Sequence, residues 1–418
     1  MNVNQITQKV QKAIKTQQQK QNDFTGDILK MMRLRHNYTQ ESLSKGLCSV
    51  SYMSKMENNQ SPTNMYVLRE VSKIYNTDIE NFTYLNDGST IIAKLTRALY
   101  YEDKELLDEI YQHIKAFGDN PIMYLYQMIA ELLDGVYYKI DDNIAEIQTL
   151  INCTQTDFTK LFSVSSAIYA YRSNRFHEAL NILYSNEALY TEIGEIISLE
   201  QIYLYLSSER VGHHSASINH FIKASQSLIE HPHTKYSLIL PLYNAYFTAM
   251  NKPEMARLMI EKMSLNQFEE KYHNIFIVTY LKSHKHKSDY KYNKNYFSKL
   301  SPNYKDESYF QSLIIYENYC KEFQLDYTPP IDNLEFDGDS NLGEMHYKVY
   351  LMNEIEEKQS YVKEVALPYA IEQQNLYYIS YFTNVLIDFA ERSSRYKEAL
   401  MVNRKREKVI KNIQTINS

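Results

Sequence analysis

A short polar stretch in the first 60 residues carries side chains suited to contacting nucleic acid. Ser49, Ser51, Tyr52 and Lys55 lie close together in a segment expected to be helical. Hydroxyl groups hydrogen-bond to base edges and phosphates, and a lysine ammonium group pairs with phosphate oxygens. A helix with these groups on one face fits the major groove, which is about 12 Å wide. The stretch therefore indicates a DNA-reading helix.

The spacing of glycine, cysteine and histidine argues against catalytic and metal sites. No glycine pair opens a G-x-G-x-x-G turn, and Gly338 and Gly343 are followed by Glu344-Met345, where a phosphate cradle needs Lys and Ser or Thr. The three cysteines lie far apart, and the histidine pairs lack the i, i+4 spacing of helical zinc ligands. We expect no enzyme activity, no catalytic residue, no cofactor and no metal.

Several short helices must position the polar face. Apolar residues at helical spacing predict helices over residues 26–36, 40–45, 50–57 and 63–75. Thr39 and Ser49 can cap the second and third helices, because a hydroxyl at that position accepts an orphan amide hydrogen bond. The break at 46–48 contains Gly46, and Asp78 is expected to cap a fifth helix. Val50, Met53 and Met56 are expected to face inward.

The same segment carries a recognisable motif. It runs from Thr39-Gln40 through the break at Gly46 to Ser49-Val50-Ser51-Tyr52, Glu57-Asn58-Asn59 and Ser61-Pro62. This order resembles the lambda-repressor-like (Xre-type) helix-turn-helix, and is most similar to the variant found on peptide-sensing regulators of Gram-positive bacteria.

The resemblance implies roles for individual residues. Gln40 would hold a phosphate or the outermost base, and Glu57 would be structural. The groove-facing residues would be Ser49, Ser51, Tyr52 and Lys55, with Asn58 and Asn59 near the DNA backbone. Two alternatives stay open: the serines can serve as caps or lie in solvent, and Tyr52 can pack inside the domain.

The rest of the chain contains internal repeats. Residues 171–180 (YRSNRFHEAL) match residues 391–400 (ERSSRYKEAL), and residues 249–258 form a third copy. A small residue, a turn and an aromatic-x-Glu-Ala-Leu segment resemble the tetratricopeptide repeat. Repeats of this kind stack because one repeat of about 34 residues cannot bury its apolar face alone. We expect an all-α chain with a right-handed superhelix of tetratricopeptide-like hairpins after the helix-turn-helix.

Such a superhelix has a concave face suited to peptides. Asn side chains donate to and accept from a peptide backbone, and Arg pairs with a carboxylate. For each candidate taken alone, a solvated side chain or a contact within the repeat is the alternative. The candidate peptide-binding residues are Ser165, Tyr171, Arg172, Thr248, Asn384, Glu391 and Arg392.

Composition and charge agree with this division of the chain. Only 9 of 418 residues are Gly and 9 are Pro, which argues against turn-rich β folds. Residues 1–86 contain 11 Lys or Arg and 7 Asp or Glu, a net of +4, so the remainder of the −6 total is −10. We expect an N-terminal arm at 1–25, a helix-turn-helix domain at 26–86 and a repeat domain at 90–418. The arm, with Lys9, Lys12, Lys15 and Lys20, is either a solvated helix or a contact for DNA or a dimer partner.

A helix-turn-helix head on a tetratricopeptide body resembles the RRNPP group of quorum-sensing regulators. The resemblance implies a homodimer that binds a double-stranded DNA operator and is switched by a short signalling oligopeptide in the repeat groove. No signal-peptide pattern or long apolar run occurs, so we expect a cytoplasmic protein with no membrane partner. The alternative is a scaffold whose repeats sequester a signalling protein such as a response regulator.

Overall fold

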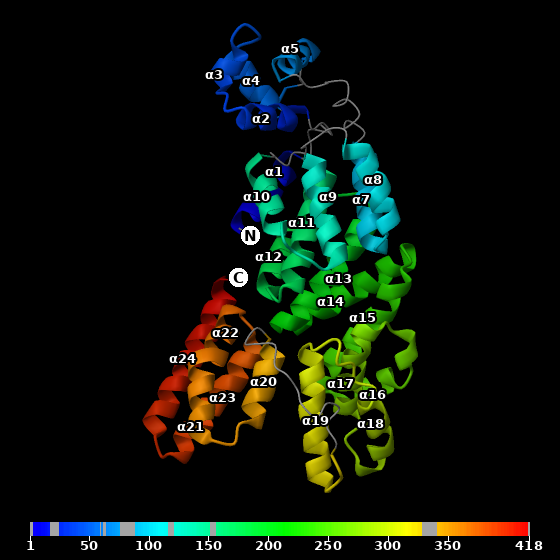
Figure 1. Ribbon diagram of the computed structural model, residues 1–418, viewed down its shortest axis with the longest axis vertical. Coiled ribbons are helices and arrows are strands. Elements are labelled where there is room, and N and C mark those ends of the chain that lie inside the picture. The colour runs from blue at the N-terminus through cyan, green and yellow to red at the C-terminus, as the bar shows by residue number, and fades with distance from the viewer. Residues whose placement is uncertain are drawn as a thin grey trace. The chain divides into compact units, whose positions relative to one another are not determined.

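In the residues that it describes, the computed structural model consists of helices, most of them joined by short turns (Figure 1). It describes residues 3–16, 25–58, 60–61, 64–75, 88–115, 121–150, 156–327 and 341–416, and no strand occurs among them. The chain forms two compact units. Residues 1–208 with 215–231 make the first unit, and residues 209–214 with 232–418 make the second. The predicted all-α fold is confirmed.

The first unit contains the helix-turn-helix domain and the first helical hairpins. Its helices are α1 (Val3–Thr16), α2 (Thr25–Arg35), α3 (Gln40–Ser44), α4 (Val50–Glu57), α5 (Met65–Tyr75), α7 (Gly88–Tyr101), α8 (Lys104–Ile114), α9 (Pro121–Asp134), α10 (Ile140–Leu150), α11 (Thr156–Arg172), α12 (Phe176–Asn186), α13 (Gly194–Val211) and α14 (His214–Glu230). The last residues of α13 belong to the second unit.

The second unit continues the hairpins to the C-terminal helix. It contains α15 (Thr234–Asn251), α16 (Pro253–Ile260), α17 (His273–Ser283), α18 (Tyr290–Phe297), α19 (Glu307–Phe323), α20 (Leu342–Leu351), α21 (Ile355–Tyr361), α22 (Leu367–Glu372), α23 (Leu376–Arg392) and α24 (Tyr396–Ile416). A π-helical turn, η7 (Val362–Ala366), joins α21 to α22.

Helices α2 to α5 enclose a small core of their own, made by Leu29, Leu43, Met53, Met56, Val67, Val71 and Tyr75. Both predicted caps are confirmed: Thr39 Oγ1 accepts from the Ser42 amide at 3.0 Å, and Ser49 Oγ accepts from the Tyr52 amide at 3.1 Å. Gly46, at the turn between α3 and α4, has φ of +80°, which a residue with a Cβ rarely adopts. The turn thus depends on glycine.

Some expectations for this domain differ from the structure. Val50 is 44% exposed rather than inward-facing, because the buried side of α4 begins at Met53. On α5, Val67, Leu68, Val71 and Tyr75 form the buried side, whereas Met65 and Ile74 are exposed. Asp78, Asn59 and the predicted domain end at residue 86 lie outside the described residues, and α7 begins at Gly88, two residues before the predicted start of the repeat domain at 90.

The predicted arm contains a packed helix. Helix α1 contacts α11 and α12, with fewer contacts to α10. Ile6, Val10 and Ala13 form its buried stripe, each with 0% of its surface exposed. The interpretation as a solvated helix is therefore wrong for the side of α1 that carries Ile6, Val10 and Ala13. Burial of each large aliphatic side chain stabilises the docked helix by roughly 1.5–3 kcal/mol.

The hairpins share one kind of turn. At Asn174 and Ser394 the backbone is left-handed, with φ of 60° and 58°. The next amide donates five residues back, from Arg175 to Ala170 O at 2.8 Å and from Arg395 to Ala390 O at 2.7 Å. This is the hydrogen bond of a Schellman motif, which closes a helix C-terminus. The sequence match between residues 171–180 and 391–400 thus corresponds to equal local structure.

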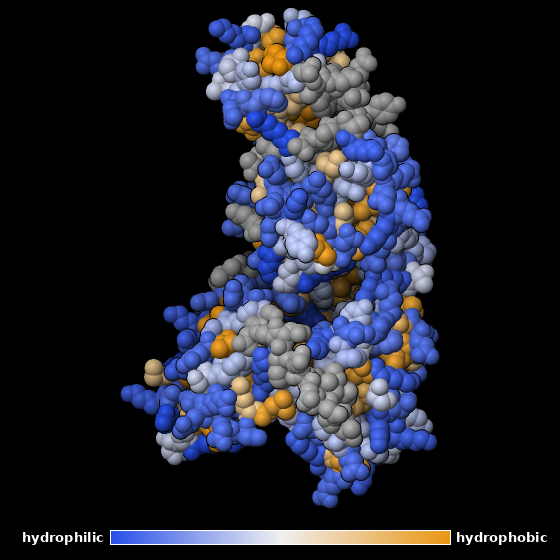
Figure 2. Space-filling view, viewed as in Figure 1, coloured by the Kyte–Doolittle hydropathy of each residue, from blue (hydrophilic) through white to orange (hydrophobic). Residues whose placement is uncertain are grey.

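The surface in Figure 2 is largely hydrophilic, with apolar residues gathered in small patches. Among the described residues, no helix is long and apolar enough to cross a membrane.

Candidate DNA-binding and peptide-binding surfaces

Helix α4 carries an exposed polar face. Ser49, Ser51 and Lys55 are all exposed. Ser49 Oγ accepts from the Tyr52 amide as the N-cap of α4, and Ser49 is also exposed on this face. The capping role and the groove-facing role are therefore compatible. Ser51 and Lys55 lie one helical turn apart on the exposed side. This arrangement places a hydroxyl and an ammonium group together on the exposed face of α4, and their contact with DNA stays a prediction.

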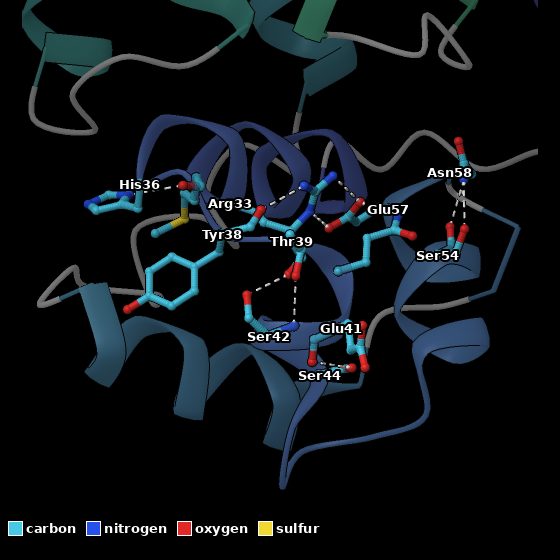
Figure 3. A network of polar contacts seen from close by, with 12 residues as sticks. Arg33, His36, Tyr38, Thr39, Glu41, Ser42, Ser44, Ser54, Glu57 and Asn58 are labelled. Atoms are coloured by element: carbon cyan, nitrogen blue, oxygen red, sulfur yellow. Dashed lines mark hydrogen bonds and ion pairs between the residues drawn. The ribbon is translucent and has the colours of Figure 1, made fainter.

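A buried ion pair fixes α4 against α2 (Figure 3). Arg33 donates from Nε to Glu57 Oε1 at 2.6 Å and from Nη2 to Glu57 Oε2 at 3.0 Å. Its Nη1 donates to the Tyr38 carbonyl at 2.9 Å, at the start of the turn into α3. The Glu57 side chain is only 1% exposed. A bidentate pair of this kind imposes a fixed geometry on both helices.

Gln40 belongs to the same network. Its Nε2 donates to Glu57 Oε2 at 2.7 Å, so α3 is tied to the end of α4. The structural role expected for Glu57 is therefore observed. Gln40 is half-buried at the first residue of α3, and its proposed phosphate contact stays a prediction.

The remaining DNA-binding candidates occupy different surroundings. Tyr52 is half-buried against the domain core, which favours its packing role. The Asn58 amide donates to the Ser54 carbonyl at 2.7 Å and so helps to end α4. Val50, which the sequence interpretation assigned to the core, is exposed beside Ser51. An exposed aliphatic group there suits the methyl group of thymine.

The predicted peptide-binding residues are divided between the two units. Ser165 has 0% of its surface exposed, so it faces no groove and we omit it from the proposal below. Tyr171 packs edge-on against Phe176 and Tyr203, and Arg172 Nη1 hydrogen-bonds the Leu132 carbonyl. These contacts favour a role within the repeats.

In the second unit the candidates are more exposed. Thr248 on α15 is half-buried. On α23, Asn384 Oδ1 accepts from Arg406 Nη1 at 2.8 Å, and Arg392 lies 3.7 Å from Asp388 in an exposed ion pair. Glu391 is exposed on the same helix. The groove role of these four residues remains a prediction.

The structure brings together a polar cluster that the sequence interpretation missed. Arg210 Nη1 lies 3.0 Å from Glu307 Oε2, and Glu307 Oε1 accepts from Gln311 Nε2 at 2.8 Å. Lys282 Nζ donates to Gln311 Oε1 at 2.8 Å and lies 4.8 Å from the centre of the Tyr246 ring. We call these five residues the second-unit polar cluster. They come from α13, α15, α17 and α19.

Burial shifts the protonation of the second-unit polar cluster. It lowers the pKa of Lys282 to about 8, with Glu307 opposing the shift and Arg210 adding to it. Burial and the charge of Lys282 lower the pKa of His346, on α20, to about 4. His346 is therefore neutral at pH 7, whereas Arg210 and Lys282 supply positive charge. The carboxylate of Glu307 balances one of these two charges within the cluster.

A spacing signal for the second-unit polar cluster exists in the sequence. Arg210, Tyr246 and Lys282 follow at intervals of 36 residues (246 − 210 and 282 − 246). This interval is close to that of a helical-hairpin repeat, so the three residues lie on alternate helices, α13, α15 and α17. The signal is carried by position rather than by residue type, and a consensus search therefore does not reveal it.

Comparisons with known proteins agree with this description. The Helix-turn-helix family model matches residues 29–82. No curated protein matches the sequence. The fold is similar to the solved apo form of the quorum sensor NprR from B. thuringiensis, with a TM-score of 0.57 and 12% identity over 78% of this chain and 99% of that chain. The chain is therefore an all-α protein in which an N-terminal helix-turn-helix domain precedes helical hairpins, with a fold similar to that of NprR.

Proposed function

We propose that the protein is a cytoplasmic, non-enzymatic transcriptional regulator of the quorum-sensing kind, which binds operator DNA through α4. The carrying observation is the exposed face of Ser51 and Lys55 on a helix held by the buried Arg33–Glu57 pair. A rigid helix with an exposed hydroxyl and cation suits entry into the major groove, where Gln40 would hold a phosphate.

We further propose that a short signalling peptide binds the helical repeats and changes DNA binding. The second-unit polar cluster supports this step, because the half-buried cations Arg210 and Lys282 can pair with a peptide carboxylate. The exposed candidates Asn384, Glu391 and Arg392 would extend the contact surface. The peptide acts as a switch only if it has different affinities for two states of the protein.

A homodimer completes the proposal. Helix α24 exposes Tyr396, Leu400 and Met401, with 67%, 51% and 64% of their surfaces accessible. A second copy that covers these side chains would remove apolar surface from water. Two heads would then read half-sites about one helical turn apart, or at a whole-turn multiple.

A gel-shift series tests the DNA-binding step. Lys55→Ala should weaken specific binding about tenfold, because it removes one phosphate or base contact. Lys73→Ala is a matched control, since Lys73 is an exposed lysine on α5 that pairs with Glu70 at 2.6 Å. The absence of specific binding with every candidate peptide, and without one, would refute the transcription-factor proposal.

The scaffold alternative makes a different prediction in cells. If the repeats sequester a signalling protein, the double variant Gln40→Ala with Lys55→Ala should keep its cellular function. Under the proposed function the same variant should lose regulation of its target promoter. A reporter-gene assay separates the two outcomes.

A further inference from the structure

A groove lies near the C-terminal end of the chain. Helices α21 and α22 with the π turn η7 form one wall, α24 forms the other, and α23 forms the floor. Its volume is about 170 Å³, below the roughly 300–1,000 Å³ typical of small-molecule sites, so it suits a row of side chains better than a drug-sized ligand. The groove is long and narrow, because its lining runs from Gln359 to Ile371 along one wall and from Glu398 to Val409 along the other. Its apolar lining comprises Leu367, Ile371, Ile379, Leu386, Val402 and Val409.

The rim of this C-terminal groove is mainly positive. Lys363 and Lys405 are exposed, and half-buried Arg406 adds a third cation. Glu398 is the single acid in the lining. The combination of an apolar floor and a cationic rim suits an occupant that is apolar on one face and acidic at its flanks.

One wall of the C-terminal groove has an unusual backbone. The Leu367 amide donates to the Val362 carbonyl, five residues back, and so defines the π turn η7. Pro368 follows directly and has no amide hydrogen for the usual helical bond. Single π turns inside α-helices are frequent at functional sites. Lys363 of the rim lies within this turn.

An equivalent place elsewhere in the chain is already filled by a helix. The matching segments at 171–180 and 391–400 make the hairpin of α11 and α12 the counterpart of α23 and α24. Helix α1 packs on α11, α12 and the preceding α10. These three helices correspond to α23, α24 and the α21–α22 helix that line the C-terminal groove.

Burial at corresponding positions agrees with this equivalence. Ile182, which lies 220 residues before Val402, has 0% of its surface exposed. Val402 itself is only half-buried. The stripe of α1 on this hairpin consists of Ile6, Val10 and Ala13, at spacings of four and three residues. In the first unit, the equivalent surface of α10, α11 and α12 thus holds an amphipathic helix with an aliphatic stripe.

We propose that the C-terminal groove binds an amphipathic helix of another protein, with aliphatic residues at i, i+4 and i+7 and acidic residues at its flanks. Helix α1 of a second copy has the right stripe and the wrong charge, because Val3–Thr16 contains lysines and no acidic residue. Its lysines would face Lys363, Lys405 and Arg406. Charge therefore selects a partner other than a second copy of α1.

Two synthetic peptides test the proposal on the full chain by fluorescence anisotropy. The first has the sequence of Val3–Thr16, 14 residues long. The second is identical except that Lys9, Lys12 and Lys15 are replaced by Glu. The acidic peptide should bind saturably and at least about tenfold more tightly than the lysine peptide, because rim charges discriminate between partners.

Charge reversal locates the binding. Lys405→Glu with Arg406→Glu should weaken the acidic peptide about tenfold and strengthen the lysine peptide. Lys397→Glu with Lys408→Glu is the matched control, because both lysines are exposed on α24 and neither lines the C-terminal groove. The control should bind both peptides as the wild type does.

A variant of unchanged charge guards against a misfolded groove. Val402→Trp fills the groove and should abolish binding of the acidic peptide while thermal unfolding of the chain stays near the wild-type temperature. The proposal is overturned if the wild type does not bind the acidic peptide saturably. It is equally overturned if the rim reversal and its control bind that peptide alike.

Discussion

At the scale of single residues, the Arg33–Glu57 pair explains how a short helix keeps a fixed orientation. The five-residue α3 and eight-residue α4 are too short to be stable alone. Glu57 accepts from Arg33 and Gln40, so one carboxylate joins α2, α3 and α4. The orientation of the exposed face of α4 therefore depends on Glu57, which is buried.

Glu57→Ala should lower the free energy of unfolding by about 3–5 kcal/mol, because it leaves the Arg33 guanidinium buried without its partner. Urea denaturation of the full chain measures the change. Glu70→Ala removes the half-buried partner of the exposed Lys73 and should change the value by less than about 1 kcal/mol. Equal effects of the two substitutions would contradict the role given to the buried pair.

Lys282 makes stability depend on pH. Its pKa is lowered from 10.5 to about 8 by burial, so the unfolded chain binds more protons between pH 8 and 10.5. The contribution of Lys282 to stability should therefore rise with pH across this window, whereas buried tyrosines such as Tyr309, whose pKa burial raises to about 12, act in the opposite direction near pH 10 and above. Lys282→Met removes this dependence and should stabilise the chain at pH 7 by about 1–3 kcal/mol, with the gain shrinking toward pH 10. Urea unfolding of both proteins at pH 7, 8.5 and 10 checks the sign.

At the scale of elements, helix α1 shows that a segment before the DNA-binding head belongs to the packed body. Val10→Asp should detach it and cost about 3 kcal/mol, because an unpaired charge replaces a fully buried aliphatic side chain. Gln8→Asp, an exposed change on the same helix, is the control. Amide hydrogen exchange over Val3–Thr16 should rise sharply in the first variant and stay at the wild-type level in the second.

The turn between α3 and α4 has a separate requirement. Gly46→Ala places a Cβ on a backbone at φ +80°, where no atom lies within 4 Å of it. The cost is then backbone strain alone, about 1–2 kcal/mol. Gly46→Asn should cost less, because asparagine tolerates the left-handed region. Thermal melts of the two variants rank them, and a smaller loss for alanine would show that the argument is wrong.

The sequence predicted local elements better than contacts between them. The apolar periodicity and the hydroxyls of Thr39 and Ser49 placed α3 and α4 to within a residue, because capping is a local interaction. The burial of Ile6 and the exposure of Val50 depend on which distant helix packs nearby, so no local pattern reveals them. The second-unit polar cluster was missed for the same reason: Lys282 and Gln311 meet only after α17 and α19 pack.

At the scale of the whole molecule, oligomeric state is the main prediction. Tyr396→Glu with Leu400→Glu places two charges on the exposed apolar face of α24. If this face joins two copies, sedimentation velocity should show a monomer for the variant and a dimer for the wild type. Operator affinity should then fall at least about tenfold, because two linked heads gain avidity over one. A wild-type monomer, or a variant that remains dimeric, would exclude this face as the interface.

The hairpin turns affect how easily the angle between neighbouring helices can change. Glu102, Asn174, Gln324, Gln374 and Ser394 all hold a left-handed backbone with a side chain attached. Each of these residues except Asn174 stores about 1–2 kcal/mol that glycine would not, because asparagine tolerates the left-handed region. The chain therefore carries backbone strain at several of its hairpin turns. These turns are less stable than they would be with glycine at the left-handed positions. A ligand that changes the angle between the helices of a hairpin can release part of this backbone strain, which lowers the free-energy cost of the change.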